Sequence, residues 1–215
     1  MSQNINECEQ IRTPKSVREP DTRTRNLIED QYEAIAEFKL NDAVPEGVAI
    51  HFETAKNLYL YAWFVYRFYS VAEHYVLATL EFALRERFSD LVNGQSSKRG
   101  LGLKKLLKYA IETGYLKNEL FSTREHWAWK RAEMRYSFEM SQKLMESGLN
   151  QIEYSLSDVK VTQEDLDNDW LGIFQETIPN IRNIHAHGSG YLYPAPVRHT
   201  FEMVSEIINQ LYPNS

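Results

Sequence analysis

Residues 58–88 read LYLYAWFVYRFYSVAEHYVLATLEFALRERF, and this stretch decides the fold class. It belongs to a longer segment, residues 48–88, that contains neither proline nor glycine. Its apolar residues recur every three to four positions, which is typical of a helix with a buried face. These residues are Leu58, Ala62, Val65, Tyr69, Ala72, Val76, Leu80 and Ala83. A second, aromatic stripe widens the apolar face. We therefore expect a central or interfacial helix, either continuous or broken near Tyr69.

The segments on either side show the same helical periodicity. It predicts helices over residues 27–40, 103–111, 122–145, 165–187 and 197–211. Pro179 should kink the fourth of these, because a proline inside a helix removes one backbone hydrogen bond and clashes with the preceding turn. Residues 153–161 fit either a short strand or irregular structure. The sequence thus predicts an all-α fold, an antiparallel helical bundle.

Length and composition indicate one folded domain. The chain has 215 residues, of which 43% are hydrophobic and 25% charged, close to the averages for globular proteins. Residues 1–26 are polar, contain two prolines and show no apolar period, so we predict a flexible N-terminal tail. Residues 27–215 are expected to form the helical domain.

The same data argue against secreted and membrane classes. Cys8 is the single cysteine and cannot form an internal disulfide, which fits a reducing compartment. The first residues lack the apolar core of a signal peptide. Arg67, Glu73 and His74 interrupt the most apolar stretch. We expect a cytoplasmic protein without a membrane partner.

Charge is distributed unevenly along this acidic chain, whose net charge is −6. Residues 98–135 contain ten Lys and Arg against four Asp and Glu, whereas residues 153–176 contain seven acidic residues and one lysine. A basic segment can hold a phosphate backbone even on an acidic protein, because the local potential decides that contact. Two solvated helix faces of opposite sign explain the pattern equally well.

The most informative motif is IPNIRNIHAHG at residues 178–188. Arg182-Asn183, three intervening residues and His187-Gly188 resemble the signature of HEPN domains, in which an arginine precedes a histidine near a helix end. Residues 79–87, TLEFALRER, and 101–107, LGLKKLL, resemble elements of Abi-like HEPN proteins. The resemblance covers about residues 48–212. It implies a HEPN-like bundle, with residues 121–162 as a helical insertion that contacts RNA or a partner.

Helical geometry constrains how this motif can act. Asn183 and His187 lie four residues apart and share a face. Arg182 precedes His187 by five residues, roughly 140° around the helix. The two side chains converge only if the helix frays near Gly188 or if a second copy completes the site. The family resemblance implies the second arrangement, a homodimer whose sites face one another across a cleft.

The expected chemistry is cleavage of RNA, whose 2′-OH serves as the nucleophile. His187 is assigned as general acid and base, Arg182 as the group that stabilises the phosphate, and Asn183 as an orienting residue. The alternative for His187 is a histidine that interacts with the last carbonyls of its helix. His185 departs from the motif spacing and is expected to be a bystander. We expect neither a metal nor a cofactor, since a lone His-x-His pair is a weak zinc signal.

Six further residues are predicted to bind substrate: Glu81, Arg85, Lys104, Lys105, Lys130 and Arg131. Glu81 and Arg85 can equally form an ordinary intrahelical ion pair. Lys130 and Arg131 lie between tryptophans and other basic residues, as on base-stacking surfaces. Packing of Trp127 and Trp129 onto the main body is the more favoured interpretation of that segment.

The leading hypothesis is a metal-independent, homodimeric HEPN endoribonuclease in prokaryotic defence or stress. A phage-defence or toxin–antitoxin role follows by resemblance, with RNA as partner and an antitoxin or regulatory protein as a further one. The alternatives are a non-catalytic HEPN-like module that binds RNA or protein, and a purely structural helical protein.

Overall fold

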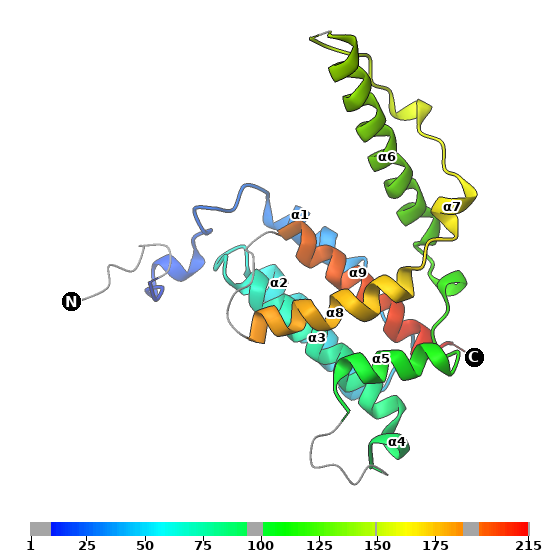
Figure 1. Ribbon diagram of the computed structural model, residues 1–215. Helices are drawn as coiled ribbons and strands as arrows, with labels where there is room; N and C mark the ends of the chain where they lie inside the picture. The colour runs from blue at the N-terminus through cyan, green and yellow to red at the C-terminus, as the bar shows by residue number, and fades with distance from the viewer. Residues whose placement is uncertain (1–9, 94–100, 149, 187–193, 215) are drawn as a thin grey trace, which may run out of the picture.

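The computed structural model describes residues 10–93, 101–148, 150–186 and 194–214 (Figure 1). Within these ranges every regular element is a helix, which confirms the predicted all-α class. No described helix combines the length and apolarity required to cross a bilayer.

The centre of the bundle is α3 (Phe68–Arg87), which packs against α2 (Glu46–Tyr61), α9 (Pro194–Leu211), α8 (Trp170–Ala186) and α5 (Leu103–Glu112). Its buried residues lie on more than one face, which explains why residues 68–87 show two apolar stripes. Opposite them, Phe201 of α9 is fully buried. Its ring lies 5.9 Å from that of Phe52 and 5.8 Å from that of Tyr59.

The long apolar segment forms two helices, broken over residues 62–67. No proline or glycine causes this break. Instead, the N-terminal segment satisfies carbonyl groups at the end of α2. The Trp63 carbonyl accepts hydrogen bonds from the Asp21 N–H and the Thr24 hydroxyl, and the Phe64 carbonyl accepts one of 2.6 Å from Arg12. These bonds replace those that a continuing helix would make.

Residues 10–26, which the sequence predicts as part of a flexible N-terminal tail, thus make hydrogen bonds to the bundle. Their anchor is the buried carboxylate of Asp21, which accepts hydrogen bonds from Arg23 at 2.8 and 2.9 Å and from the Tyr66 N–H at 3.3 Å. The short 3₁₀ helix η2 (Ser16–Arg18) lies in the same segment. Anchoring by the hydrogen bonds of a single carboxylate does not require apolar residues at regular spacing. The sequence pattern therefore gave no sign that this segment is anchored.

Asp21 should make stability depend on pH. Burial alone would raise the pKa of its carboxyl group, but the bonds from Arg23 and Tyr66 lower it from 3.8 to about 2. Because the folded pKa lies below the unfolded one, the stabilisation exists above pH 3.8 and is lost as pH falls towards 2. Asp21→Asn should cost about 2 kcal/mol of unfolding free energy at pH 7.

Urea unfolding of both proteins at several pH values measures this difference, with the exposed Asp42→Asn as control. The cost of Asp21→Asn should shrink to near zero by about pH 2. A difference that stays constant with pH would show that the Asp21 charge does not carry the stabilisation.

The arm, residues 124–162, projects from the bundle (Figure 1). It contains α6 (Arg124–Ser147), which ends at Gly148 with φ 67°, a left-handed conformation that favours glycine. Residues 150–162, the return segment, run back beside α6. They contain a 3₁₀ helix, η4 (Leu156–Asp158), so the alternative of a strand over residues 153–161 is wrong. The arm occupies most of the segment expected to be an insertion.

A buried carboxylate fixes the base of the arm. Asp165 of α7 (Gln163–Leu166) is fully buried and accepts a 2.9 Å bond from Arg135 and two of 2.8 Å from the N–H and hydroxyl of Thr162. The hydrogen bond from Arg135 lowers the pKa of Asp165 well below its usual range, despite burial. Arg131 lies 3.6 Å from the same carboxylate. Together these contacts tie α6 to α7.

The remaining elements are short or differ slightly from prediction. They are α1 (Ile28–Ala36), α4 (Ser89–Asn93) and η3 (Asn118–Leu120). The helix expected over residues 165–187 is divided into α7 and α8, because Asp169 accepts a hydrogen bond from the Gly172 N–H and so caps the start of α8. The helix assignment of α8 continues through Pro179.

Candidate functional site

A charged cluster lies where α3 and α8 pack together. One oxygen of Glu81 accepts a 2.7 Å hydrogen bond from Arg85, and the other lies 3.6 Å from a guanidinium nitrogen of Arg182. Arg85 also donates a 2.7 Å bond to the carbonyl of Leu101, just before α5. Glu81, Arg85 and Arg182 are called the Glu81 cluster below.

The Glu81 cluster unites residues predicted separately. The Glu81–Arg85 pair follows from the spacing of one helix, whereas the contact with Arg182 joins residues 101 positions apart. The Glu81 side chain is only 16% exposed, while that of Arg182 is 40% exposed. Arg182 is therefore held at one edge by a carboxylate, and it still faces solvent, where an anion can reach it. Its 3.6 Å contact is long enough to yield to a better-placed phosphate.

The rest of the motif is described in part. Asn183 follows Arg182 on α8 and is exposed. One residue turns a helix by about 100°, so Asn183 points away from the face that meets Glu81. His187 lies outside the described residues. The geometry that would join it to Arg182 therefore stays a prediction from the sequence.

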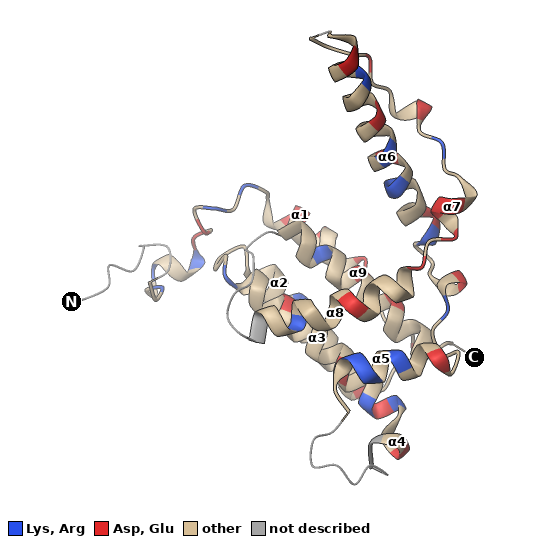
Figure 2. Ribbon diagram, in the orientation of Figure 1, with Lys and Arg blue, Asp and Glu red and all other residues tan. Residues whose placement is uncertain are grey.

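Lysines of α5 extend the positive charge beside the Glu81 cluster (Figure 2). Lys104 forms a 2.7 Å ion pair with Glu176 of α8, and both side chains are more than half exposed. Lys105 is exposed on the same helix. An exposed pair of this kind contributes at most about 1 kcal/mol, so Lys104 can leave Glu176 for a phosphate at little cost.

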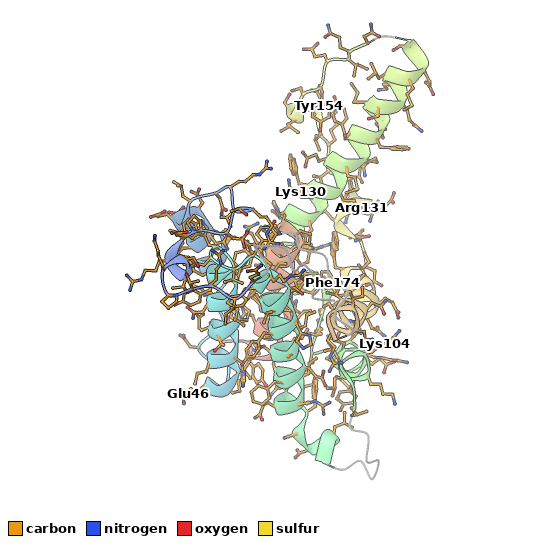
Figure 3. The ribbon with its side chains drawn as sticks, turned by 90° about the vertical axis from the view of Figure 1, so that its left-hand side faces the viewer. Glu46, Lys104, Lys130, Arg131, Tyr154 and Phe174 are labelled. Carbon is orange, nitrogen blue, oxygen red and sulfur yellow. The ribbon has the colours of Figure 1, made fainter. Side chains whose placement is uncertain are left out.

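Lys130 and Arg131 lie elsewhere, at the base of the arm (Figure 3). Arg131 donates to Glu164 at 2.9 Å and to Asn168, and Lys130 lies 3.3 Å from Glu133. These basic groups have acidic partners within the arm and α7. The contacts favour a role for Arg131 in fixing the arm over one in substrate binding.

The tryptophans near these residues differ in role. Trp127 is buried, and its ring packs against those of Phe121, Trp170 and Phe174 at 5.2 to 5.4 Å. For Trp127, this confirms the sequence interpretation in which the tryptophan packs the arm onto the main body. Trp129 is partly exposed and lies beneath the Lys130 ammonium, 5.1 Å from its ring centre.

The two oppositely charged segments pair with each other. Within the described residues, five ion pairs join residues 98–135 to residues 153–176: Lys104–Glu176, Arg124–Asp167, Arg131–Glu164, Arg131–Asp165 and Arg135–Asp165. Neither of the two sequence interpretations included this mutual neutralisation. Glu176 in particular was not singled out, although the opposite charge balances were the signal that could have identified such partners.

Among residues 10–93, 101–148, 150–186 and 194–214, no three His, Cys, Asp or Glu side chains gather in a way suited to hold a metal ion. The chain matches no protein-family model, and neither a curated protein nor a solved structure shows significant similarity to it. The Glu81 cluster is thus a candidate site on its own geometry.

Proposed function

We propose that this protein is a HEPN-like, metal-independent endoribonuclease that acts as a homodimer in prokaryotic defence or stress. The observation that supports this most is the placement of Arg182. The motif arginine lies on a solvent-facing surface between two helices, next to a second arginine and held by one carboxylate.

The proposed reaction needs few groups. The RNA 2′-OH attacks the adjacent phosphate and the 5′-oxygen leaves, which forms a 2′,3′-cyclic phosphate. His187 exchanges the protons, and Arg182 stabilises the negative charge that develops on the phosphorane. Glu81 acts as a positioning residue, because its carboxylate fixes one edge of the Arg182 guanidinium and leaves the other for phosphate.

In the proposed homodimer, α8 forms most of the interface with the second copy. The apolar residues of α3 that suggested an interface are largely used inside one copy, where Tyr69, Val76 and Leu80 are buried. The exposed apolar residues near the motif are Ile173 and Ile184, each about two-fifths exposed on α8. Both isoleucines lie about 160–180° around α8 from Arg182, so a two-fold contact that brings both copies of Arg182 to one cleft must use the opposite, Arg182 side of α8.

A second candidate is the non-catalytic HEPN-like module that binds RNA or protein. The observation that favours it is that Glu81 already neutralises charge on both Arg85 and Arg182. In that case the Glu81 cluster serves to join α3 to α8. Cleavage of total RNA in excess EDTA by the wild type but not by Arg182→Ala/His187→Ala separates the two functions.

RNA binding should depend on the lysines of α5. Lys104→Ala/Lys105→Ala should weaken binding of single-stranded RNA and reduce the slope of log K against log salt by about 1.4, since each phosphate contact contributes about 0.7. Fluorescence anisotropy at several salt concentrations measures this slope.

The matched control is Lys39→Ala/Lys143→Ala, which removes the same charge from exposed positions on α6 and next to α1. An equal change in slope for both double variants would mean that net charge, not the α5 surface, attracts the RNA. No change for either would count against an RNA interface at α5.

A further inference from the structure

The arm carries a line of exposed apolar side chains that the proposed function does not use. Met134, Phe138 and Met145 of α6 are 75%, 64% and 84% exposed. Their spacings of four and seven residues place them on one face of the helix, within about 40° of one another. We call these three residues and Ser141, which lies between them, the arm seam. Three large apolar side chains in one line are uncommon on a monomer surface and mark an interaction site.

The return segment leaves the arm seam uncovered. It packs on a different face, through a ring contact of 5.4 Å between Tyr136 and Tyr154 and a 3.1 Å bond from Arg135 to the carbonyl of Lys160. Tyr136 lies about 200° around the helix from Met134. Figure 3 shows the arm standing clear of the bundle, with Tyr154 on its return segment.

The base of the arm seam opens into a groove of about 530 Å³ between α6, α8 and the start of α9. Met134 lines this groove together with Trp127, Trp170 and Ile173. Several of its charged lining residues are paired: Arg131 with Glu164, Lys130 with Glu133, Arg198 with Glu37 and His199 with Glu202. An occupant of the groove therefore needs apolar side chains more than charge.

We propose that the arm seam pairs with the arm seam of a second copy, the two α6 helices running antiparallel. Arg131, Met134, Phe138, Ser141 and Met145 alternate by three and four residues, the 3.5-residue period of a coiled-coil contact. With the two-fold axis between positions 139 and 140, Met134 of each copy meets Met145 of the other. The tip of each arm then lies beside the groove at the base of its partner.

Charge selects the antiparallel direction. In a parallel pair, Lys130 of one helix would flank Arg135 of the other, which places like charges together. In the antiparallel register, Arg135 flanks the neutral Gln142 of the second copy. The same arrangement uses the whole seam, because all 12 residues from Met134 to Met145 lie opposite the same 12 residues of the second copy.

The contact area indicates a weak association. Three such side chains present on the order of 400 Å² per copy, so two seams with their grooves bury about 1,000 Å² in total. This lies at the low end for specific complexes, which is typical of transient contacts. The arm contact is centred on α6, although its groove includes Ile173 of α8, and it does not depend on RNA cleavage.

Cysteine cross-linking tests the register in the full chain with Cys8 replaced by serine. A tagged Met134→Cys protein mixed with an untagged Met145→Cys protein should form a disulfide-linked heterodimer under mild oxidation. Either protein alone should not, because equivalent positions lie about 16 Å apart and a disulfide needs Cα atoms within about 7 Å. Cross-linking of each variant alone, or none in the mixture, would overturn the proposal.

The second readout is the average molecular mass, measured by sedimentation. Protein concentrations of roughly 10 to 500 micromolar suit a weak contact. The average mass should rise with concentration, and Phe138→Glu should abolish that rise. Lys143→Glu, on the opposite face of α6, should not. Equal masses for wild type and Phe138→Glu at all concentrations, with native circular dichroism for both, would contradict arm pairing. Neither readout requires the protein to cut RNA.

Discussion

Replacing Arg182 or His187 with alanine is expected to slow RNA cleavage by about 10²–10⁴-fold, the range for lost acid–base or charge-stabilising groups. The Arg182 side chain is 40% exposed and forms a 3.6 Å ion pair with Glu81, so its loss removes little packing. An exposed or partly exposed ion pair contributes about 1 kcal/mol or less, and Arg182→Ala should therefore leave the unfolding free energy nearly unchanged. Single-turnover cleavage and urea unfolding measure the two quantities.

Three variants make this test specific. His185→Ala should retain most activity, since residue 185 lies outside the motif spacing. Arg182→Lys should restore only part of it, because an ammonium cannot present two parallel donors to a phosphate. Glu81→Gln should lower the rate less than Arg182→Ala does, as expected for a positioning residue. Equal losses for His185→Ala and His187→Ala would refute the assignment of the motif histidine.

Phe201→Ala should produce the largest loss of stability, about 3–5 kcal/mol, through a cavity at the centre of the bundle. The ring is fully buried on α9 and contacts Phe52 and Tyr59 of α2. Its removal deletes contacts on both rings, and the surrounding helices relax only in part. Urea unfolding followed by circular dichroism gives the difference.

Phe138→Ala is the matched control, because it removes the same side chain from an exposed site on the arm. Its effect should stay within about 0.5 kcal/mol in dilute solution, as for most surface substitutions. Comparable losses for the two variants would mean that Phe201 is not part of the central core.

The fold class was predictable because it depends on local periodicity. The apolar stripes from Leu58 to Ala83 and the helix stops at Gly114 and Gly148 are visible in the sequence, and both glycines adopt left-handed conformations. The break between α2 and α3 was not predictable to the residue. It depends on bonds from Arg12 and Asp21, some 40 to 50 positions away, and such contacts leave no periodic signal.

The candidate site shows the same division. The four-residue spacing indicated that Glu81 and Arg85 form a pair, and the motif resemblance indicated that Arg182 is functional. The contact between Arg182 and this pair depends on the packing of α3 against α8, which the sequence does not show. Arg131 was among the residues predicted to bind substrate, because the sequence does not reveal that Glu164, 33 positions away, is its partner, whereas the i,i+3 spacing of Lys130 and Glu133 is visible. Charge pairing between distant segments is a tertiary property and requires the fold.

The most direct measurement is the chemistry of the cleavage products. Total RNA and single-stranded DNA are incubated with the purified wild type in excess EDTA, beside an identically prepared Arg182→Ala/His187→Ala variant that reports contaminating nucleases. The proposed mechanism predicts RNA fragments that end in 2′,3′-cyclic phosphate, intact DNA and an inactive double variant. Undiminished cleavage by the double variant, or cleavage of DNA, would contradict it.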